Sequence, residues 1–312
     1  MPQGARSASD GIGMSGLSTA CYTLLRVRRI LLRWRWYAWH LLARARHPVV
    51  TVPPADPPRY RRAICLLTEI PDTTQIEFLR GIPGYDLLVI CDDNTYDLTL
   101  LRASCRDTVF VQVDELRCLR AGYRQLNAVV KFGVPSAWDK AMYFLGDIIS
   151  DRYEHVWFLE SDVLVPAIDT IPAIDAKYGE GPDLLSGTVS SYADMPDWYF
   201  WSKHHDSSLP RVRCQASAIR VSRSLIGRVR SYAAKQGRLI FLESFLPSLA
   251  VRDGLRCEDI PELDTVQYHA RWDPAAVQRS NLYHPVKQLT EHQDAQRRFG
   301  PRLGRDGPAP HQ

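Results

Sequence analysis

From about residue 62, short apolar runs alternate with segments of helical spacing. Five runs have the length and apolar content of buried strands: Ala63–Leu67, Tyr85–Cys91, Thr108–Val113, His155–Leu159 and Leu184–Val189. Strands about 25 residues apart, with helices between them, are typical of a mainly parallel sheet. The pattern therefore predicts an α/β fold in which helices flank a mainly parallel sheet.

Capping residues mark where several helices begin and end. Gln75–Arg80 suits a short helix after the first strand. Ser136 caps a second helix, and Asp139 completes a capping-box-like pair with it. Ser222 caps a further helix, which we expect to stop at Gly237 because glycine is common just past a helix end.

The N-terminal segment has a different pattern from the body of the chain. Residues 1–16 are small and polar, so we expect them to be disordered, and residues 17–47 follow helical spacing with arginines on a second face. The longest arginine-free run, 36–43, has eight residues, whereas a membrane span needs about 20. Tryptophans among arginines fit a helix that lies on an anionic membrane. The alternative is a solvated helix packed on its own domain.

The distribution of charge along the chain supports this division between the N-terminal segment and the body. The net charge of the 312 residues is +4, and the first 62 residues hold eleven Arg, no Lys and two acids. A basic arm on a near-neutral body does not suggest nucleic acid as a partner. We expect the basic helix and a Pro-rich linker in 1–59, the main folded domain in 60–290, and a disordered tail rich in Gln, Arg, Gly and Pro in 291–312.

The seven cysteines indicate in which cellular compartment the protein folds. Their number is odd and they include no C-x-x-C pair, so we expect neither a disulfide framework nor a structural zinc site. Cys65 and Cys91 lie inside apolar runs, where free thiols behave as small hydrophobic side chains. Reduced thiols indicate a cytoplasmic protein, and the basic helix adds peripheral contact with the cytoplasmic face of a membrane.

Two carboxylates follow the fourth predicted strand, in the stretch HVWFLESDVLVP. Glu160 and Asp162 are two residues apart, so in an extended chain they point to the same side. Two carboxylates that close repel each other unless a cation lies between them. Oxygen ligands without cysteine favour Mg²⁺ or Mn²⁺. The alternative is that Glu160 caps a turn and Asp162 pairs with an arginine.

Polar residues also follow the first two strands. Thr68 and Glu69 end the first strand, and Asp92 and Asp93 end the second. Because ligands of α/β sheets bind beyond the carboxyl ends of the strands, these groups can hold the ribose or the base of a nucleotide. Lys140, in the first turn of its helix, fits a diphosphate that also contacts the helix amides. A solvated surface lysine is the alternative for Lys140.

The order of these elements, with the runs DLLVICDDN and VWFLESDV, resembles the GT-A fold of nucleotide-sugar-dependent glycosyltransferases. The signature of that family is a hydrophobic strand that ends in Asp-x-Asp. The resemblance covers roughly residues 62–290 and implies a GT-A-like catalytic domain in 60–290. It implies that Asp162 ligates Mn²⁺ or Mg²⁺. Glu160 stands where the family usually has its first Asp, and would hold the ribose or reach the metal through water.

The resemblance also implies a histidine as a third metal ligand near the end of the catalytic domain. Two histidines are candidates, His269 in Tyr268-His269 and His284 in NLYHPVK. We favour His284, because Pro285 fixes the backbone after it and Lys287 adds a partner for phosphate. A packed or surface histidine is the alternative for either position.

Inverting members of the family use a carboxylate base at the start of a helix that follows the acceptor loop. Glu243 matches this position, since it is the only acid among the twelve residues from Leu239 to Ala250. Its apolar neighbours should raise its pKa, which suits a base near neutral pH. A surface glutamate on the polar side of the helix is the alternative, and Asp259 or Glu262 are further candidates for the base.

A dense aromatic group lies between the predicted metal-binding strand and that helix, in DMPDWYFWSKHH. Aromatic faces stack on the apolar faces of sugar rings, so Trp198 and Trp201 are predicted to form a platform for the acceptor. Core packing, or a helix on a membrane face, is an equally good explanation of the same pattern.

Together these features predict a metal-dependent glycosyltransferase. It would move a hexosyl or related group from a nucleotide-sugar donor to a hydroxyl of a glycan or lipid-linked acceptor, with inversion. A nucleotidyltransferase can share this sheet, but it normally has a Gly-rich loop where this chain has TEIPDTTQ. The rival from another class is a non-catalytic protein that binds at a membrane surface.

Overall fold

The computed structural model describes residues 57–127, 134–268 and 271–300. The predicted helix 17–47 and the candidate ligand His269 lie outside the described residues, so both stay predictions. Within the part of the chain that is described, no helix combines the length and the apolar character needed to cross a lipid bilayer.

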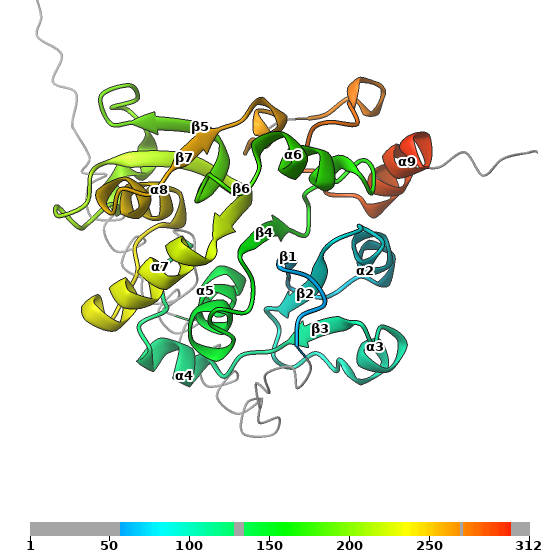
Figure 1. The fold of residues 1–312 in the computed structure, drawn as a ribbon, viewed down its shortest axis with the longest axis horizontal. Coiled ribbons are helices and arrows are strands. Elements are labelled where there is room, and N and C mark those ends of the chain that lie inside the picture. The colour runs from blue at the N-terminus through cyan, green and yellow to red at the C-terminus, as the bar shows by residue number, and fades with distance from the viewer. Residues whose placement is uncertain (1–56, 128–133, 269–270, 301–312) are drawn as a thin grey trace, which may run out of the picture. The chain divides into compact units, whose positions relative to one another are not determined.

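A seven-stranded sheet forms the centre of the described fold (Figure 1). Its strands are β1 Arg62–Thr68, β2 Asp86–Cys91, β3 Thr108–Val111, β4 His155–Glu160, β5 Leu184–Ser191, β6 Val212–Ser222 and β7 Cys257–Asp259. The strand order is β3-β2-β1-β4-β6-β5-β7. The first four strands in this order are parallel, β7 is parallel to β5, and β6 is antiparallel to both of its neighbours. The predicted α/β fold with a mainly parallel sheet is confirmed.

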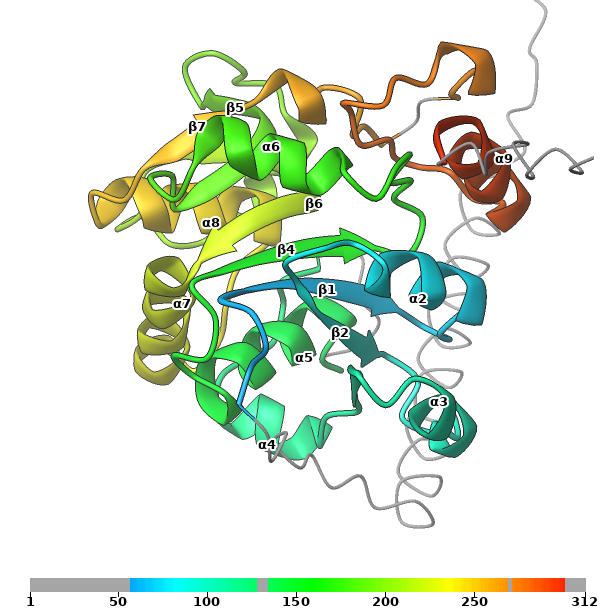
Figure 2. The same ribbon diagram turned by 45° about the vertical axis from the view of Figure 1, so that its right-hand side comes forward.

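Helices cover both faces of the sheet (Figures 1 and 2). One face packs against α4 Glu115–Arg120, α5 Ala137–Tyr143 with its π-helical continuation η1 Phe144–Ile148, α7 Arg223–Gln236 and α8 Leu242–Arg252. The other face packs against α2 Thr73–Arg80, α3 Thr99–Ser104 and α6 Thr170–Tyr178. The described elements also include the 3-10 turns η2 Tyr199–Lys203, η3 Pro261–Leu263 and η4 Pro274–Ala276, and the helix α9 Leu289–Phe299.

The sequence of β1 explains this layered arrangement. Ile64 and Leu66 belong to the core on the α2 side, whereas Ala63 and Cys65 belong to the core on the α5 side. All four side chains are fully buried. A central parallel strand is covered on both faces, so its apolar run is continuous rather than alternating.

The observed helix ends agree with the predicted caps. Ser136 and Asp139 form a reciprocal capping box at the start of α5. Ser222 accepts a hydrogen bond from the backbone of Leu225 at the start of α7, and Gly237 ends that helix with a φ of 64°. Glycine suits this left-handed position because it has no Cβ.

Strand β6 is an element that the sequence pattern does not predict. Polar residues interrupt its apolar positions in VRCQASAIRVS, which hides a long buried strand. It pairs with β4 from Ser222 to Ala218 only. Residues 212–217 therefore extend past the carboxyl end of β4, where they pair with β5 alone. The extension borders the sheet edge at which Glu160 and Asp162 lie.

The predicted disordered tail needs a correction at its start. Residues 289–299 form helix α9 (Figure 2). Ala295 packs with Leu164 and Tyr283 in a small apolar cluster, and His292 is buried one turn earlier. The prediction was wrong here because few residues of this mostly polar helix face inward: His292 and Ala295 are buried, and Phe299 packs partly buried against the same cluster.

The buried carboxylate of Asp175 connects four elements of the fold through hydrogen bonds. The Asp175 side chain, on α6, accepts hydrogen bonds from Arg220 of β6 at 2.7 Å, Trp157 of β4 at 3.1 Å and Arg62 of β1 at 3.2 Å. Tyr85 donates a fourth hydrogen bond. Asp175 and Arg220 are both buried, so each depends on the other for charge compensation.

Asp175→Asn should destabilise the protein strongly. The substitution leaves the buried guanidinium of Arg220 without its counter-charge, which typically costs about 3–5 kcal/mol of unfolding free energy. Chemical denaturation measures the change. The matched control is Asp169→Asn, which breaks an exposed pair with Arg279 and should change stability little. Equal effects of the two substitutions would contradict the role given to Asp175.

Candidate active site

A cavity of about 470 Å³ lies at the carboxyl ends of β1, β2 and β4. This volume is within the range of about 300–1,000 Å³ that is usual for small-molecule sites. Polar residues of the three strand ends line it together with residues from α5, α9 and the segment before α9: Thr68, Glu69, Asp92, Ser136, Glu160, Asp162, Lys287 and His292. The structure thus gathers at one cavity groups that are far apart in the sequence.

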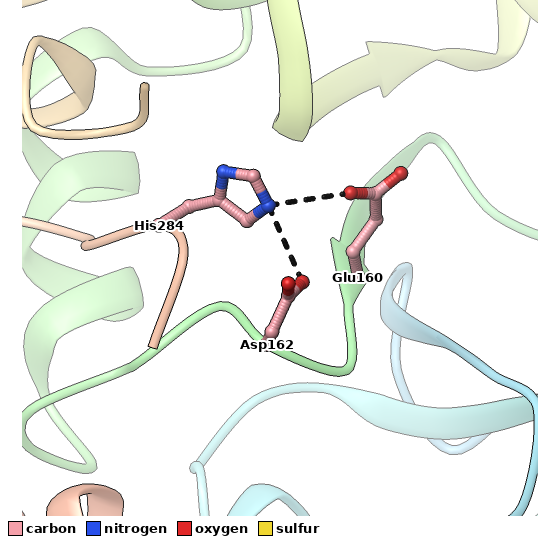
Figure 3. Close-up of side chains that lie close together, drawn as sticks. All are labelled: Glu160, Asp162 and His284. Carbon is pink, nitrogen blue, oxygen red and sulfur yellow. Dashed lines mark ion pairs between the residues drawn. The ribbon is translucent and has the colours of Figure 1, made fainter. Parts of the chain in front are cut away.

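Glu160, Asp162 and His284 converge beside this cavity. His284 Nε2 lies 3.3 Å from Asp162 Oδ1 and 3.5 Å from Glu160 Oε2 (Figure 3). One ligand atom from each residue lies within 4.8 Å of the others. Ligand atoms bonded to Mg²⁺ at about 2.1 Å lie within about 4.2 Å of each other, so small side-chain shifts suffice to hold one ion.

Hydrogen bonds from outside this trio fix its orientation. His284 Nδ1 lies 2.8 Å from the backbone carbonyl of Gln267, so Nδ1 carries a proton and Nε2 faces the carboxylates. The backbone N–H of His284 donates to the carbonyl of Thr265 at 3.2 Å. On the other side, the indole N–H of Trp138 donates to Glu160 Oε1 at 2.8 Å. Two separate parts of the chain therefore hold the ligand atoms in place.

The charges of the trio and of Lys287 balance one another. Burial raises the pKa of Asp162, but hydrogen bonds from His284 and Lys287 outweigh burial and lower it to about 2. Burial lowers the pKa of His284, but the hydrogen bond and the charge of Asp162 outweigh burial and raise it above its usual value. Lys287 forms an ion pair with Asp162 Oδ2. The carboxylates are thus compensated by positive charge, as a divalent cation would compensate them.

The chemistry of these donors fits Mn²⁺ or Mg²⁺. Two carboxylates and one imidazole nitrogen are hard or borderline ligands, which suit these ions. Across residues 57–127, 134–268 and 271–300, this trio is the group of His, Cys, Asp and Glu side chains whose ligand atoms converge. The structure therefore brings together the three residues that the sequence singles out as metal ligands.

Four of the six predicted nucleotide-binding residues lie at the cavity, namely Thr68, Glu69, Asp92 and Lys287, whereas Asp93 and Lys140 do not line it. Asp93 caps a turn instead, because its Oδ1 accepts hydrogen bonds from the backbone N–H of Thr95 at 2.8 Å and from its hydroxyl at 2.7 Å. Asp93 thus has a local structural contact, and its nucleotide-binding role stays a prediction.

Lys140 has a structural role in place of the predicted contact with a diphosphate. Its side chain is 1% exposed, and Nζ donates to the Asp92 carbonyl at 2.6 Å. The same nitrogen lies 2.9 Å from Asp92 Oδ1 and 3.1 Å from Glu115 Oε1. A buried ammonium needs such partners because its desolvation is costly. Lys140 is therefore neither a surface residue nor a phosphate ligand, and it fixes Asp92 at the cavity wall.

Glu243 is buried in the first turn of α8. Its side chain is 2% exposed, and Oε1 accepts a hydrogen bond from the Ala216 backbone at 3.4 Å. Burial raises the pKa of Glu243 to about 7, although a hydrogen bond with Tyr268 opposes the rise. The nearby charge of Glu160 adds to the rise. A surface glutamate is excluded, and the pKa suits proton exchange near neutral pH.

A short segment of chain connects Glu243 with the trio. Tyr268, whose side chain interacts with Glu243, directly follows Gln267, whose carbonyl orients His284. Val266 forms a parallel bridge with His284. The position of the candidate base and the position of the histidine ligand therefore depend on the same segment, 265–268.

The alternative bases serve other contacts. Asp259 Oδ1 accepts a hydrogen bond from the backbone of Thr188 at 2.8 Å. Glu262 forms an ion pair with Lys177 at 2.6 Å and accepts a hydrogen bond from Tyr178 at 2.7 Å. These contacts attach the loops around β7 to β5 and α6, which leaves Glu243 as the buried carboxylate among the three candidates.

The two predicted acceptor tryptophans differ in burial, since Trp201 is buried and Trp198 is half-buried. Trp201 is 7% exposed, its indole N–H donates to a backbone carbonyl at 2.8 Å, and its ring contacts Trp198 at 4.8 Å. The rings of Trp198 and Phe241 stack with their centres 5.9 Å apart, and Cζ of Arg213 lies 5.0 Å from the centre of the Trp198 ring. Core packing therefore explains Trp201, whereas the acceptor role of the half-buried Trp198 stays a prediction. Tyr199, which is 79% exposed, is the aromatic residue of the group that faces solvent.

Four residues at the site were missed by reasoning from sequence. Gln75 Nε2 donates to the Ser161 carbonyl at 2.8 Å, and His292 Nε2 lies 2.9 Å from the Val286 carbonyl. Trp138 and Tyr268 contact Glu160 and Glu243. A polar side chain at the start of the helix after β1 was a usable signal for Gln75. His292, Trp138 and Tyr268 lie in segments whose hydrophobic spacing predicts only core or loop.

The comparisons with known proteins add distant structural neighbours. No family model matches the chain, and no curated protein matches it. The fold is similar to mouse xyloside xylosyltransferase 1 in its apo form, with 10% identity over 64% of this chain and 84% of that chain, at a TM-score of 0.35. It is also similar to the mannosyltransferase Ktr4p of S. cerevisiae, with 11% identity over 65% and 69% of the chains, at a TM-score of 0.33. Both neighbours are named as glycosyltransferases, but TM-scores this low carry no weight for the function of this chain.

Glu243→Gln should remove a pH dependence of stability. The pKa of Glu243 is about 7 in the folded protein against an ordinary 4.5, so between these values the folded state holds a proton that the unfolded chain has lost. The free energy of unfolding should therefore fall as pH rises through this window, by about 3 kcal/mol, and level off above it. Denaturant titrations near pH 5 and pH 8 measure the fall. An equal fall in wild type and variant would contradict the buried, protonated carboxyl group.

Proposed function

We propose that this protein is a metal-dependent glycosyltransferase that uses a nucleotide-sugar donor. The observation that carries the proposal is the convergence of Glu160, Asp162 and His284 at the carboxyl edge of the sheet, beside a cavity large enough for a nucleotide. Ligands of α/β sheets bind at this edge, and metal sites for diphosphates use oxygen-rich ligand sets.

The cavity offers different chemistry to the two ends of such a donor. Thr68, Glu69 and Asp92 provide a hydroxyl and two carboxylates for ribose hydroxyls or a base edge. The exposed Lys287 provides a positive charge for the diphosphate beside Asp162. When bound, Mn²⁺ or Mg²⁺ would supply positive charge that stabilises the leaving diphosphate. Asp162, Glu160 and His284 would hold the ion.

Glu243 is the general base of this proposal. It takes the proton of an acceptor hydroxyl while that oxygen attacks the anomeric carbon of the donor sugar. As the new C–O bond forms, the bond to the diphosphate oxygen breaks, so the configuration at the anomeric carbon inverts. The pKa of about 7 allows Glu243 to accept this proton near neutral pH.

The acceptor in this proposal is a glycan or a lipid-linked sugar. The Trp- and Arg-rich segment 17–47 supports peripheral contact with an anionic membrane, where such acceptors reside. A cytoplasmic location belongs to the same proposal and is supported by the cysteine pattern of the sequence.

Asp162→Asn should abolish Mn²⁺-dependent binding of nucleoside diphosphates while the protein stays folded. The variant loses the carboxylate that His284 and Lys287 both contact. Isothermal titration with a panel of nucleoside diphosphates, with and without Mn²⁺, measures the loss, and circular dichroism checks folding. Asp169→Asn, an exposed acid paired with Arg279, is the matched control. Unchanged nucleotide affinity in Asp162→Asn would remove the central claim.

Glu243→Gln should leave donor binding near the wild-type level and reduce turnover. The variant keeps the size of the side chain but cannot accept a proton, and loss of a general base typically costs about 10²–10⁴ in rate. Turnover is measured as release of nucleoside diphosphate from the nucleotide sugar that binds. Glu262→Gln, at the alternative base, should keep full turnover. A rate within a few-fold of wild type for Glu243→Gln would exclude Glu243 as the base.

A further inference from the structure

A second group of polar side chains is buried near Glu243 without hydrogen-bond partners. Within the described structure, Arg213 Nε, Gln215 Nε2 and Ser190 Oγ are buried atoms that make no hydrogen bond. Most buried polar atoms of folded proteins have a partner, so a cluster of unpaired ones requires an explanation. Two of these atoms are donors and the third, a hydroxyl, can donate. The missing partner is therefore a hydrogen-bond acceptor.

The three residues occupy one place in the fold. Arg213 and Gln215 are two residues apart on β6, so their side chains point to the same side of the strand. Ser190 of β5 is the direct pairing partner of Arg213. All of them belong to the part of the β5–β6 ladder that extends past the end of β4. None of the three lines the cavity at the strand ends, so they form a separate group.

Arg213 forms no ion pair with an acid of the described residues. Its side chain is 6% exposed. A terminal nitrogen contacts Met195 Sδ at 3.0 Å, and Cζ lies 5.0 Å from the centre of the Trp198 ring. Neither contact supplies negative charge. The equally buried Arg220 shows the usual solution, since it is paired with Asp175 at 2.7 Å.

The surroundings of Arg213 suit a sugar-like molecule. Met195, which contacts Arg213, is 42% exposed, and the guanidinium lies over the ring of Trp198, so apolar and aromatic surface borders the buried charge. Ala216, which follows Gln215 on β6, donates its backbone N–H to Glu243 Oε1 at 3.4 Å, so the group lies beside the first turn of α8. A molecule held at Arg213 would therefore lie close to the base.

We propose that Arg213, with Gln215 and Ser190, binds an anionic group of the acceptor, a carboxylate or a phosphate. This inference rests on the proposed function, because it names the class of acceptor for the same site. The planar guanidinium of arginine forms two parallel hydrogen bonds with either group, which a neutral hydroxyl cannot match. The amide of Gln215 and the hydroxyl of Ser190 supply further donors. The acceptor is accordingly an acidic sugar or a sugar phosphate.

The test compares three probes that differ only around carbon 6 of the same ring: methyl glucoside, methyl glucuronide and methyl glucoside 6-phosphate. Binding to the full-length protein is measured by ligand-observed NMR without nucleotide and with a chelator in place of metal. We expect at least one anionic probe to bind about tenfold or more tightly than the neutral one, the usual value of a charge-assisted hydrogen bond. A preference for the glucuronide indicates a carboxylate, and a preference for the 6-phosphate indicates a phosphate. Equal binding of all three probes, or no binding of either anionic probe, overturns the proposal.

Variants then locate the preference. Arg213→Met should remove it, and Gln215→Leu should weaken it. Arg211→Met is the matched control, since Arg211 is an exposed arginine two residues away that lies over Tyr192. Lys287→Met excludes the cation of the donor cavity. A preference that survives in folded Arg213→Met, or that disappears in Lys287→Met, overturns the assignment. If Arg213→Met does not fold, the wild-type comparison together with Gln215→Leu and Lys287→Met still decides.

This test is independent of the one for the donor site. It uses neither metal nor nucleotide, so its outcome does not depend on Asp162. Loss of anion preference with intact Mn²⁺-dependent nucleotide binding would remove the acceptor inference alone. Anion preference at Arg213 without any nucleotide binding would remove the glycosyltransferase proposal and leave an acidic-sugar site.

Discussion

Parallel pairing of β1, β2 and β4 is the constraint on which the site depends. It places the carboxyl ends of the three strands at one edge of the sheet. Residues in the first turn of α5 then form hydrogen bonds with residues at two of these ends. Trp138 donates to Glu160 at the end of β4, and Lys140 binds the carbonyl and the carboxylate of Asp92 at the end of β2. This turn is itself held by a capping box in which the buried Asp139 accepts from Ser136 and Leu126. One helix start therefore sets the spacing between two walls of the cavity at the strand ends.

Buried charges in this protein fall into two kinds. Asp175 and Lys140 have complete sets of partners, which makes them supports of the fold. Arg213 and Glu243 are also buried, yet Arg213 forms no ion pair within the described part of the chain, and burial raises the pKa of Glu243 to about 7. Incompletely compensated charge costs stability, so it persists where a ligand or a reaction uses it. The incompletely compensated charges, Arg213 and Glu243, lie at the part of β6 that extends past β4.

Much of the fold and of the metal trio could be predicted from the sequence. Strands covered on both faces leave continuous apolar runs, and caps leave Ser and Gly at fixed places, so β1, β2, β4 and α7 were found. Glu160 and Asp162 were found because a strand fixes the direction of residues two apart. His284 was found only through the resemblance to a family, since nothing local brings it 3.3 Å from Asp162.

The remaining features depend on tertiary contacts that a sequence does not display. Lys140 looks like a surface lysine until Asp92 and Glu115 are placed around it. The polar positions of β6 hide a strand because their partners lie on other elements, and α9 is anchored by too few apolar residues to show a pattern. The rings of Trp198 and Trp201 contact each other edge to face, so the close spacing of aromatic residues in this segment reflects packing between them.

The hydrogen bond that orients His284 ends on a main-chain carbonyl rather than on a side chain. Residue 267 therefore orients the candidate ligand His284 through the path of its main chain and not through its chemical identity. Its own side chain donates a hydrogen bond elsewhere, to the Asp264 carbonyl. Replacement of Gln267 by other residues leaves the acceptor oxygen where it is. Insertions or deletions between Gln267 and His284 would instead rotate the imidazole away from Asp162. The path of the main chain at residue 267, rather than its side chain, therefore sets the orientation of the imidazole.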